Sequence, residues 1–212
     1  VTAEFVGCGM PKKNQRKSSV DWSNASTANG LQDIEDTVVA ASAEGVTIRY
    51  VVMHVADFSL LKKQKSTFDT LKAWVNSSSK ILVTKNLINE YLAEQEIPVK
   101  IITVNPSVRI EDKAHRRKTI NPWERKRVCF LEDLKVGDIQ HGPIAAESSA
   151  TLQKIALMVK QDWVLVTKWS ELEPFKEWTK AEANAIPVVN DPDAMFIMKV
   201  DGKDWNASED TE

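Results

Sequence analysis

The sequence predicts a fold of the α+β class. Two observations carry this prediction. Several segments before residue 96 place apolar residues at three- and four-residue steps, whereas short β-branched runs between turn residues dominate after residue 155. Hydrophobic residues make up 42% of the 212 residues and charged residues 27%, which provides a sizeable core without disulfides or metals.

The helices are predicted mainly in the first half of the chain. Residues 1–30 are rich in Gly, Ser and Asn and show neither helical nor strand periodicity. A strand is predicted at 47–53, and Gly45 favours the left-handed conformation that ends a helix before it. Four segments carry an apolar face typical of a helix: 31–44, 56–63, Ser66 to Asn76, and Thr84 to Pro98.

The second half is predicted to be mostly strands, with a turn-rich stretch at 136–143 and a hairpin turn at Gln161-Asp162. The segment 168–184 is ambiguous: its apolar residues recur every three positions, as in a helix, but Pro174 would break one. Trp163 is predicted to lie within a strand. The predicted strands are 99–104, 107–111, 128–131, 155–159, 163–167, 185–189 and 195–200.

Residues 112–127, the basic segment, hold seven Lys or Arg and two acids, so the segment carries +5 and the rest of the chain −7. The segment lacks an apolar period and contains Pro122, which predicts a loop. Three interpretations stay open. The loop is simply solvated, or it contacts an acidic patch on another protein, or its cations bind nucleic-acid phosphates while Trp123 stacks on a base. The net charge of −2 argues against a chain that coats nucleic acid as a whole.

The sequence contains no catalytic, metal-binding or cofactor-binding motif. His54, His115 and His141 have no partner at metal-ligand spacing, and Cys129 lies in an apolar run where an inert buried thiol is expected. We therefore expect no enzyme, no metal and no cofactor. The longest apolar runs are about six residues, too short to span a membrane, so no membrane partner is expected. Two distant cysteines indicate a reducing setting.

The order of several short motifs resembles the major capsid proteins of tailed phages related to the phage lambda head protein. In that family an Asp-Trp segment leads into an acidic amphipathic helix, then a strand and a short helix. The matching residues here are Val20–Ser23, Asp33–Glu35, Gly45, Tyr50–Met53 and Ala56–Leu61, followed in order by Val99–Val104, Trp123–Leu131, Val136-Gly137, Gly142-Pro143, Pro174–Thr179, Ile186–Val188 and Phe196–Val200.

The resemblance implies the α+β capsid fold first described for phage Hong Kong 97, with an axial domain near the capsomer centre and a peripheral domain that contains a spine helix and a long β-sheet. The helix at 31–44 would be the spine helix, and 168–184 would be strands. We expect the chain to lack the N-terminal arm and extended loop of the family, and to be a monomer or small oligomer alone. The implied ranges are 21–46 and 168–203 (peripheral), 47–167 (axial), 1–20 (a disordered or partly ordered remnant) and 204–212 (an acidic tail).

The implied function is that of a structural subunit of a tailed-phage or prophage capsid, which self-assembles into hexamers and pentamers of an icosahedral head around double-stranded DNA. Its partners would be copies of itself, scaffold, portal or decoration proteins, and non-specific DNA. It would be found in the virion and, during assembly, in the bacterial host cytoplasm.

Ring closure requires heterologous contacts between copies. On this hypothesis the basic segment supplies them, and deleting 113–127 leaves folding intact but impairs assembly. The alternative is a nucleic-acid-binding protein that acts through 112–127. The predicted intersubunit residues are Arg116, Arg117, Lys118, Trp123 and Arg125.

Overall fold

The computed structural model describes residues 9–76, 81–97, 99–111, 116–148, 157–173 and 175–205. The chain divides into two compact units. The first unit comprises Val1–Leu134 and Asp191–Glu212, and the second comprises Lys135–Asn190.

The first unit is built on a mixed five-stranded sheet with the strand order β1-β12-β6-β2-β3. The outer pairs β1/β12 and β2/β3 are parallel, whereas β6 runs antiparallel to both of its neighbours. The inner strands are largely buried because their β-branched and aromatic side chains pack on both faces of the sheet. The strands are β1 (Gln15–Lys17), β2 (Tyr50–His54), β3 (Lys100–Val104), β6 (Arg127–Leu131) and β12 (Phe196–Lys199).

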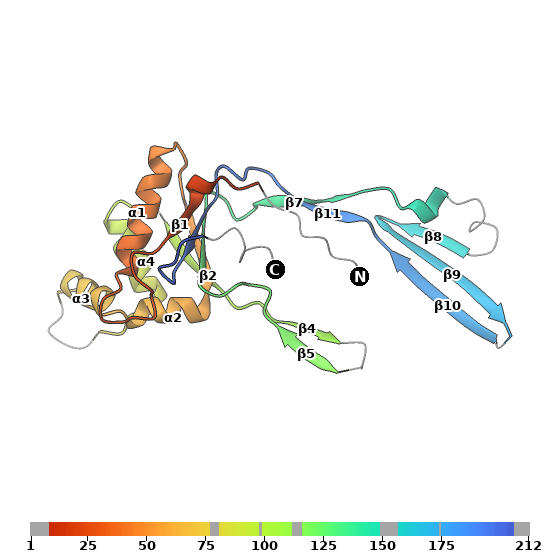
Figure 1. Ribbon diagram of the computed structural model, residues 1–212, viewed down its shortest axis with the longest axis horizontal. Helices are drawn as coiled ribbons and strands as arrows, with labels where there is room; N and C mark the ends of the chain where they lie inside the picture. The colour runs from red at the N-terminus through yellow and green to blue at the C-terminus, as the bar shows by residue number, and fades with distance from the viewer. Residues whose placement is uncertain are drawn as a thin grey trace. The chain divides into compact units, whose positions relative to one another are not determined.

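Four helices bury their apolar faces in the same core (Figure 1). In the first of them, Leu31, Ile34 and Ala41 are buried while Val39 is exposed, as the three- and four-residue spacing predicts. Thr84 caps the last of them, since its hydroxyl accepts a hydrogen bond from the Leu87 backbone N–H. The helices are α1 (Gly30–Ala43), α2 (Val55–Lys63), α3 (Lys65–Trp74) and α4 (Lys85–Glu94).

The segment before α1, which contains the Asp-Trp pair, is hydrogen-bonded to the helix. Trp22 is fully buried, and its indole N–H donates to the Asp33 carboxylate at 2.9 Å. The other oxygen of Asp33 accepts from the Ser19 backbone N–H at 3.0 Å, so this buried acid has two donors. Gly30 begins the helix where space is short: its N–H donates to Gln64 Oε1 at 2.7 Å, and an added Cβ would lie 2.5 Å from Leu61.

A two-stranded hairpin, which we call the arm, extends from the sheet (Figure 1). It pairs β4 (Val108–Glu111) antiparallel with β5 (Arg117–Ile120), with Val108 opposite Ile120 and Glu111 opposite Arg117. All four residues of β4 are exposed. An isolated two-stranded hairpin is only marginally stable in water, so the arm depends on contacts at its base or with other molecules.

The second unit consists of two small antiparallel sheets. In one, β7 (Gly137–His141) pairs with β11 (Ala185–Val189), and Gly137 lies so close to the Val188 carbonyl that an added Cβ would be 2.1 Å from its oxygen. In the other, the order is β10-β9-β8, with β8 (Leu157–Gln161), β9 (Val164–Leu172) and β10 (Phe175–Glu182). The β8–β9 turn has Asp162 at φ +51°.

The structure confirms the predicted helices, a hairpin around residue 162 and a strand interpretation of 168–184. The hairpin turn is Asp162-Trp163, one residue later than predicted, because Gln161 ends β8 opposite Val164. The three-residue spacing in that segment is not helical: Trp169 and Trp178 face each other across two strands, with ring centroids 6.4 Å apart. A mixed α/β chain is observed, whereas the ranges of axial and peripheral domains stay a prediction. The two compact units have other boundaries than those ranges.

Four local predictions were wrong. Gln15–Lys17 form a strand although no alternation marks them, because they add to the edge of β12. Residues 137–141 pair with β11 instead of forming turns only. Part of the predicted loop 112–127 is strand β5. Trp163 lies in the β8–β9 turn and is 59% exposed, stacked on His141 at 5.2 Å.

Candidate functional site: the arm and its anchor

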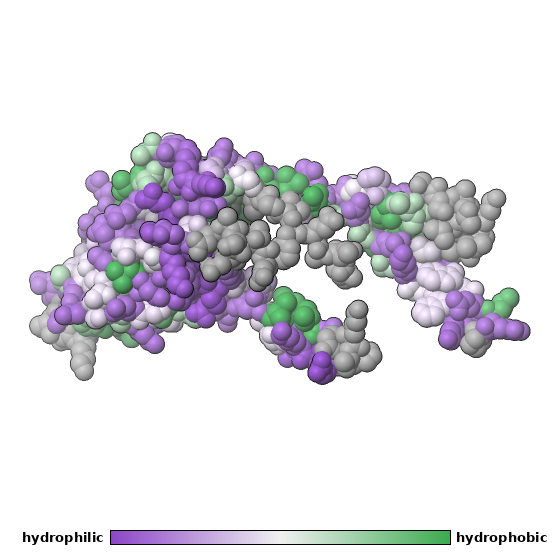
Figure 2. Space-filling view, in the orientation of Figure 1, coloured by the Kyte–Doolittle hydropathy of each residue, from purple (hydrophilic) through white to green (hydrophobic). Residues whose placement is uncertain are grey.

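The arm has two chemically different faces. Residues opposite each other in an antiparallel pair share a face, so Val108, Ile110 and Ile120 lie together with Lys118, and Arg109 and Arg117 lie on the other face with Glu111 and Thr119. Val108 and Ile110 are 47% and 42% exposed. Figure 2 shows hydrophobic residues gathered on the arm. The arm therefore offers a partner both apolar surface and positive charge.

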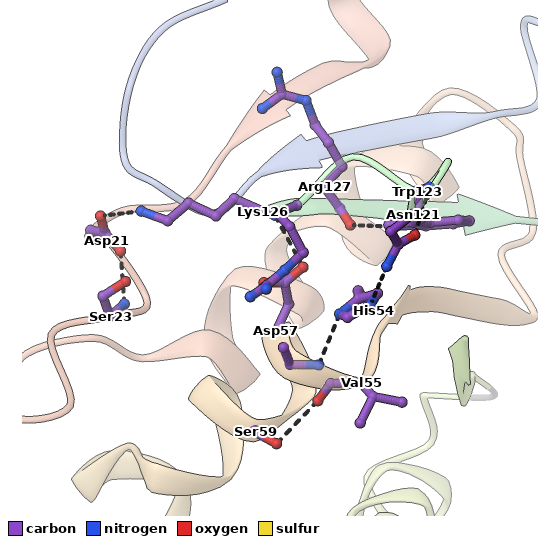
Figure 3. A network of polar contacts seen from close by, with 12 residues as sticks. Asp21, Ser23, His54, Val55, Asp57, Ser59, Asn121, Trp123, Lys126 and Arg127 are labelled. Atoms are coloured by element: carbon purple, nitrogen blue, oxygen red, sulfur yellow. Dashed lines mark hydrogen bonds and ion pairs between the residues drawn. The ribbon is translucent and has the colours of Figure 1, made fainter. Parts of the chain in front are cut away.

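A buried carboxylate holds the base of the arm (Figure 3). Asp57 lies in the first turn of α2 and is fully buried. Its Oδ1 accepts from Arg125 Nη2 at 2.9 Å and from Nε at 3.3 Å, and its Oδ2 accepts from the Lys126 backbone N–H at 3.0 Å. We call Asp57, Arg125 and Lys126 the anchor. It fixes the chain between β5 and β6 against the helical side of the unit.

Lys126 takes an unusual backbone conformation at this point, with φ of +61°. Residues other than glycine rarely adopt this left-handed region, which indicates that the surrounding contacts hold the Lys126 backbone there. Its ammonium group pairs with Asp21 Oδ2 at 2.9 Å. Burial alone would raise the pKa of Asp21, but hydrogen bonds from Ser23 and Lys126 outweigh burial and lower it. The contact joins the anchor to the segment before α1.

His54 also has a structural task. It ends β2, and its Nδ1 accepts from the Ala56 N–H at 3.0 Å, so that the side chain caps α2. Its Nε2 lies 2.8 Å from Asn121 Nδ2, while Asn121 Oδ1 accepts from the Trp123 backbone N–H at 2.9 Å. The Trp123 indole N–H donates to the Arg127 carbonyl at 3.3 Å. These contacts shape the return from β5 to β6 (Figure 3).

Arg127 lies at the start of β6 and pairs with Glu124 at 2.8 Å. Its guanidinium also lies 4.8 Å from the ring centre of Trp205, and the Lys199 ammonium lies 4.9 Å from the same ring. The Trp205 N–H donates to the Arg16 carbonyl at 2.6 Å. The segment after β12 is thus fastened across the sheet by cation–π contacts.

The structure separates the five predicted site residues into two groups. Arg116, Arg117 and Lys118 are exposed at the start of the arm's second strand. Trp123 and Arg125 lie at the base, where they bond within the chain. Residues 112–115, which belong to the basic segment, lie outside the described residues. Deleting 113–127 would remove Arg125, Lys126 and the first residue of β6, so from the structure we expect this deletion to destabilise the first unit, contrary to the expectation from the sequence.

Sequence reasoning did not assign a role at the base of the arm to Asp21, Asp57 or Asn121. Asp21 and Asp57 both lie within motifs that carry the family resemblance, and Asp57 is also an acid in the first turn of a helix. Its partners lie 68 and 69 positions further along the chain, a separation that no local pattern reveals.

The described residues hold no group of three or more His, Cys, Asp or Glu placed to bind a metal ion. Cys129 is partly buried, and this burial raises the pKa of its thiol to about 11, so the thiol is protonated at neutral pH. Within the described part of the chain, no helix is long and apolar enough to cross a membrane.

Comparison with solved structures identifies the fold. A proposed capsid protein of a prophage in Escherichia coli CFT073 matches with a TM-score of 0.55 and 15% sequence identity, over 90% of this chain and 54% of that chain. A phage-related protein from Bordetella bronchiseptica RB50 matches with a TM-score of 0.49 and 12% identity, over 89% of this chain and 55% of that chain. The chain thus spans about half the length of these solved structures. No family model and no curated protein matches the chain. The protein has a phage capsid-like fold.

Proposed function

We propose that the protein is a structural subunit of a tailed-phage or prophage capsid, without enzymatic activity. The observation that carries the proposal is the similarity of fold to the prophage protein of Escherichia coli across 90% of the chain. On this proposal the chain adopts the Hong Kong 97-type arrangement, with α1 as the spine helix. Copies assemble into the hexamers and pentamers of a shell that encloses double-stranded DNA. The protein is in the host cytoplasm during assembly and in the virion afterwards.

The exposure of the second unit supports a role in assembly. Seventeen large hydrophobic side chains are exposed among the described residues, and ten of them lie in this unit, which is about a quarter of the chain. Large exposed apolar surfaces mark sites of interaction with other proteins. Contacts with other subunits would cover it. The ten are Val136, Ile139, Leu157, Val159, Trp163, Val164, Leu172, Phe175, Trp178 and Ile186.

The arm is the proposed cationic contact between neighbours. Arg116, Arg117 and Lys118 would meet acidic residues of the next copy, because the chain outside the basic segment carries −7. Trp123 and Arg125 would contribute to the contact indirectly, by fixing the angle at which the arm leaves the sheet. Exposed charge pairs are individually weak, about 0–1 kcal/mol, which lets misplaced subunits dissociate.

The nucleic-acid alternative finds less support. Arg125, Lys126 and Arg127 are each paired with a carboxylate of the same chain. The Trp123 indole is partly buried and hydrogen-bonded to the backbone, so it is not presented to a base. Among the described residues of the basic segment, Arg117 and Lys118 lie on the exposed strand β5, where they could meet phosphates. Salt-dependent binding of duplex DNA that is lost in Arg117→Glu/Lys118→Glu would nevertheless restore this alternative.

The test is assembly of the protein expressed from its complete reading frame, followed by light scattering and negative-stain electron microscopy. We expect the wild type to form particles of one size and Arg117→Glu/Lys118→Glu to form none while staying folded. The matched control is Lys63→Glu/Lys65→Glu, which makes the same change of charge at exposed positions of the helical face. Particles from the arm variant equal to those of the control would refute the arm's role.

A further inference from the structure

The outer edge of β10 is unusually open. β10 is eight residues long and forms eight consecutive pairs with β9, from Phe175 opposite Leu172 to Glu182 opposite Leu165. No other strand of the described residues pairs with its far side. Seven of its eight residues are exposed (Figure 1 shows the strand at the margin of its sheet). An unpaired edge presents backbone donors and acceptors to any other extended strand.

This edge lacks most of the devices that protect sheets from pairing. It contains no proline between 175 and 182, and no described residue of the strand has a positive φ that would mark a glycine-type bulge. The strand is neither short nor covered by a helix. Its only protection is charge, with Lys176, Glu177, Lys180 and Glu182 along eight positions and a net charge of zero.

We propose that β10 pairs antiparallel with β10 of a second copy, about a two-fold axis at Thr179. The inference deepens the proposed function, on which it rests, by naming one contact of the assembly. When a two-fold axis runs perpendicular to the sheet, residues that lie opposite each other have their side chains on the same face of the sheet. Each possible register therefore has one residue at its centre, and that residue lies opposite its own copy. The charges of the strand distinguish these registers.

The register centred on Thr179 sets Lys176 opposite Glu182 of the second copy, twice, and Trp178 opposite Lys180, twice. It pairs all residues from 176 to 182. Centring on Trp178 sets Lys176 opposite Lys180 twice, and centring on Lys180 sets that lysine opposite itself. Centring on Ala181 keeps one type of opposite-charge pair but joins only the strand's last few residues. Opposite charges across strands stabilise pairing and like charges oppose it, so the charge pattern selects Thr179.

The result would be a continuous six-stranded sheet shared by two copies, β8-β9-β10 against β10-β9-β8. The Trp169–Trp178 stack lies on the same face as Lys176, Lys180 and Glu182, so each Trp178 meets a lysine of the other copy. In a shell, such a contact joins two subunits isologously, in addition to the heterologous contacts that close a ring.

Cysteine cross-linking tests the register. Opposite residues in antiparallel strands have Cα atoms about 4.5–5.5 Å apart, within the range that a disulfide spans. In a chain with Cys8→Ser and Cys129→Ala, we expect Thr179→Cys to form disulfide-linked dimers at least about ten-fold faster than either control, since only its sulfurs meet at the axis. The controls are Ala181→Cys, on the same strand and face, and Lys168→Cys, beside Thr179 on β9.

Charge exchange supplies an independent readout. Sedimentation of Lys176→Glu and of Glu182→Lys should show about ten-fold weaker dimers, and the double variant should regain most of the loss, because opposite charges again face each other. The ion pair between Lys180 and Glu182 within one chain is lost both in Glu182→Lys and in the double variant. Its loss therefore does not contribute to the difference in dimer affinity between these two variants.

Equal cross-linking at 179 and 168, or faster cross-linking at 181, would overturn the proposal, as would absence of rescue in the double variant. If particles form from the complete reading frame while these tests fail, the capsid proposal stands and only the β10 contact falls. If no particles form but Thr179→Cys cross-links as expected, the β10 contact stands without a capsid role.

Discussion

Removing either partner of the Asp57–Arg125 pair should cost a different amount of stability. Asp57 is fully buried, whereas the Arg125 side chain is 50% exposed. Arg125→Met keeps an apolar stem over Asp57 but leaves a buried carboxylate without its cation, which costs about 3 kcal/mol, at the low end of values for broken buried pairs. Asp57→Ala leaves a guanidinium that water can solvate and one backbone N–H without its acceptor. This variant should lose only about 2 kcal/mol.

The double variant decides whether the two residues act as a pair. Asp57→Ala/Arg125→Met should be about 1 kcal/mol more stable than Arg125→Met alone, because removing the carboxylate removes the buried charge. Urea unfolding followed by far-ultraviolet circular dichroism measures this well, since all four α-helices of the described chain lie in the first unit. Losses that simply add in the double variant, or a greater loss in Asp57→Ala than in Arg125→Met, would refute the reasoning.

Three further predictions concern single positions. Gly30→Ala should destabilise the chain by about 1–3 kcal/mol through overpacking against Leu61, as judged by urea unfolding, and a loss below half a kcal/mol would contradict the close packing. Lys126→Gly should be more stable than Lys126→Ala by up to about 1 kcal/mol, because both lose the Asp21 pair but only glycine relieves the positive φ; equal stability would argue against strain. The pKa of Cys129 is raised from 9.0 to about 11 in the folded state, so the stability linked to its proton is complete below pH 9.0 and is lost as pH rises towards 11. Unfolding in this range should be steeper in pH for the wild type than for Cys129→Ala, and identical slopes would contradict the burial.

Elements with a local signal could be predicted from the sequence. The face of Leu31, Ile34 and Ala41 and the capping hydroxyl of Thr84 act within one or two turns of helix, so their pattern is visible in a short window. The same holds for the hairpin turn at Asp162. The order of motifs along the chain indicated a capsid protein, and the fold is capsid-like.

Features that depend on distant partners could not be predicted. β1 exists because β12, about 180 residues later, offers an edge for it. The charges of the basic segment did not reveal which of its cations pair within the chain, because Asp57 and Asp21 meet Arg125 and Lys126 only once the chain is folded. The spacing of Trp169, Phe175 and Trp178 suggested a helix, but these residues lie on two paired strands of a hairpin. Trp169 and Trp178 meet across the strands and not along one face of a helix.

The most direct test of the proposed role is cryo-electron microscopy of the protein purified after expression of its complete reading frame, with neighbouring phage head genes present. We predict closed shells in which copies surround five-fold and six-fold axes, with both units of each copy fitting the density. Discrete monomers or dimers at every concentration and in every co-expression would contradict the account.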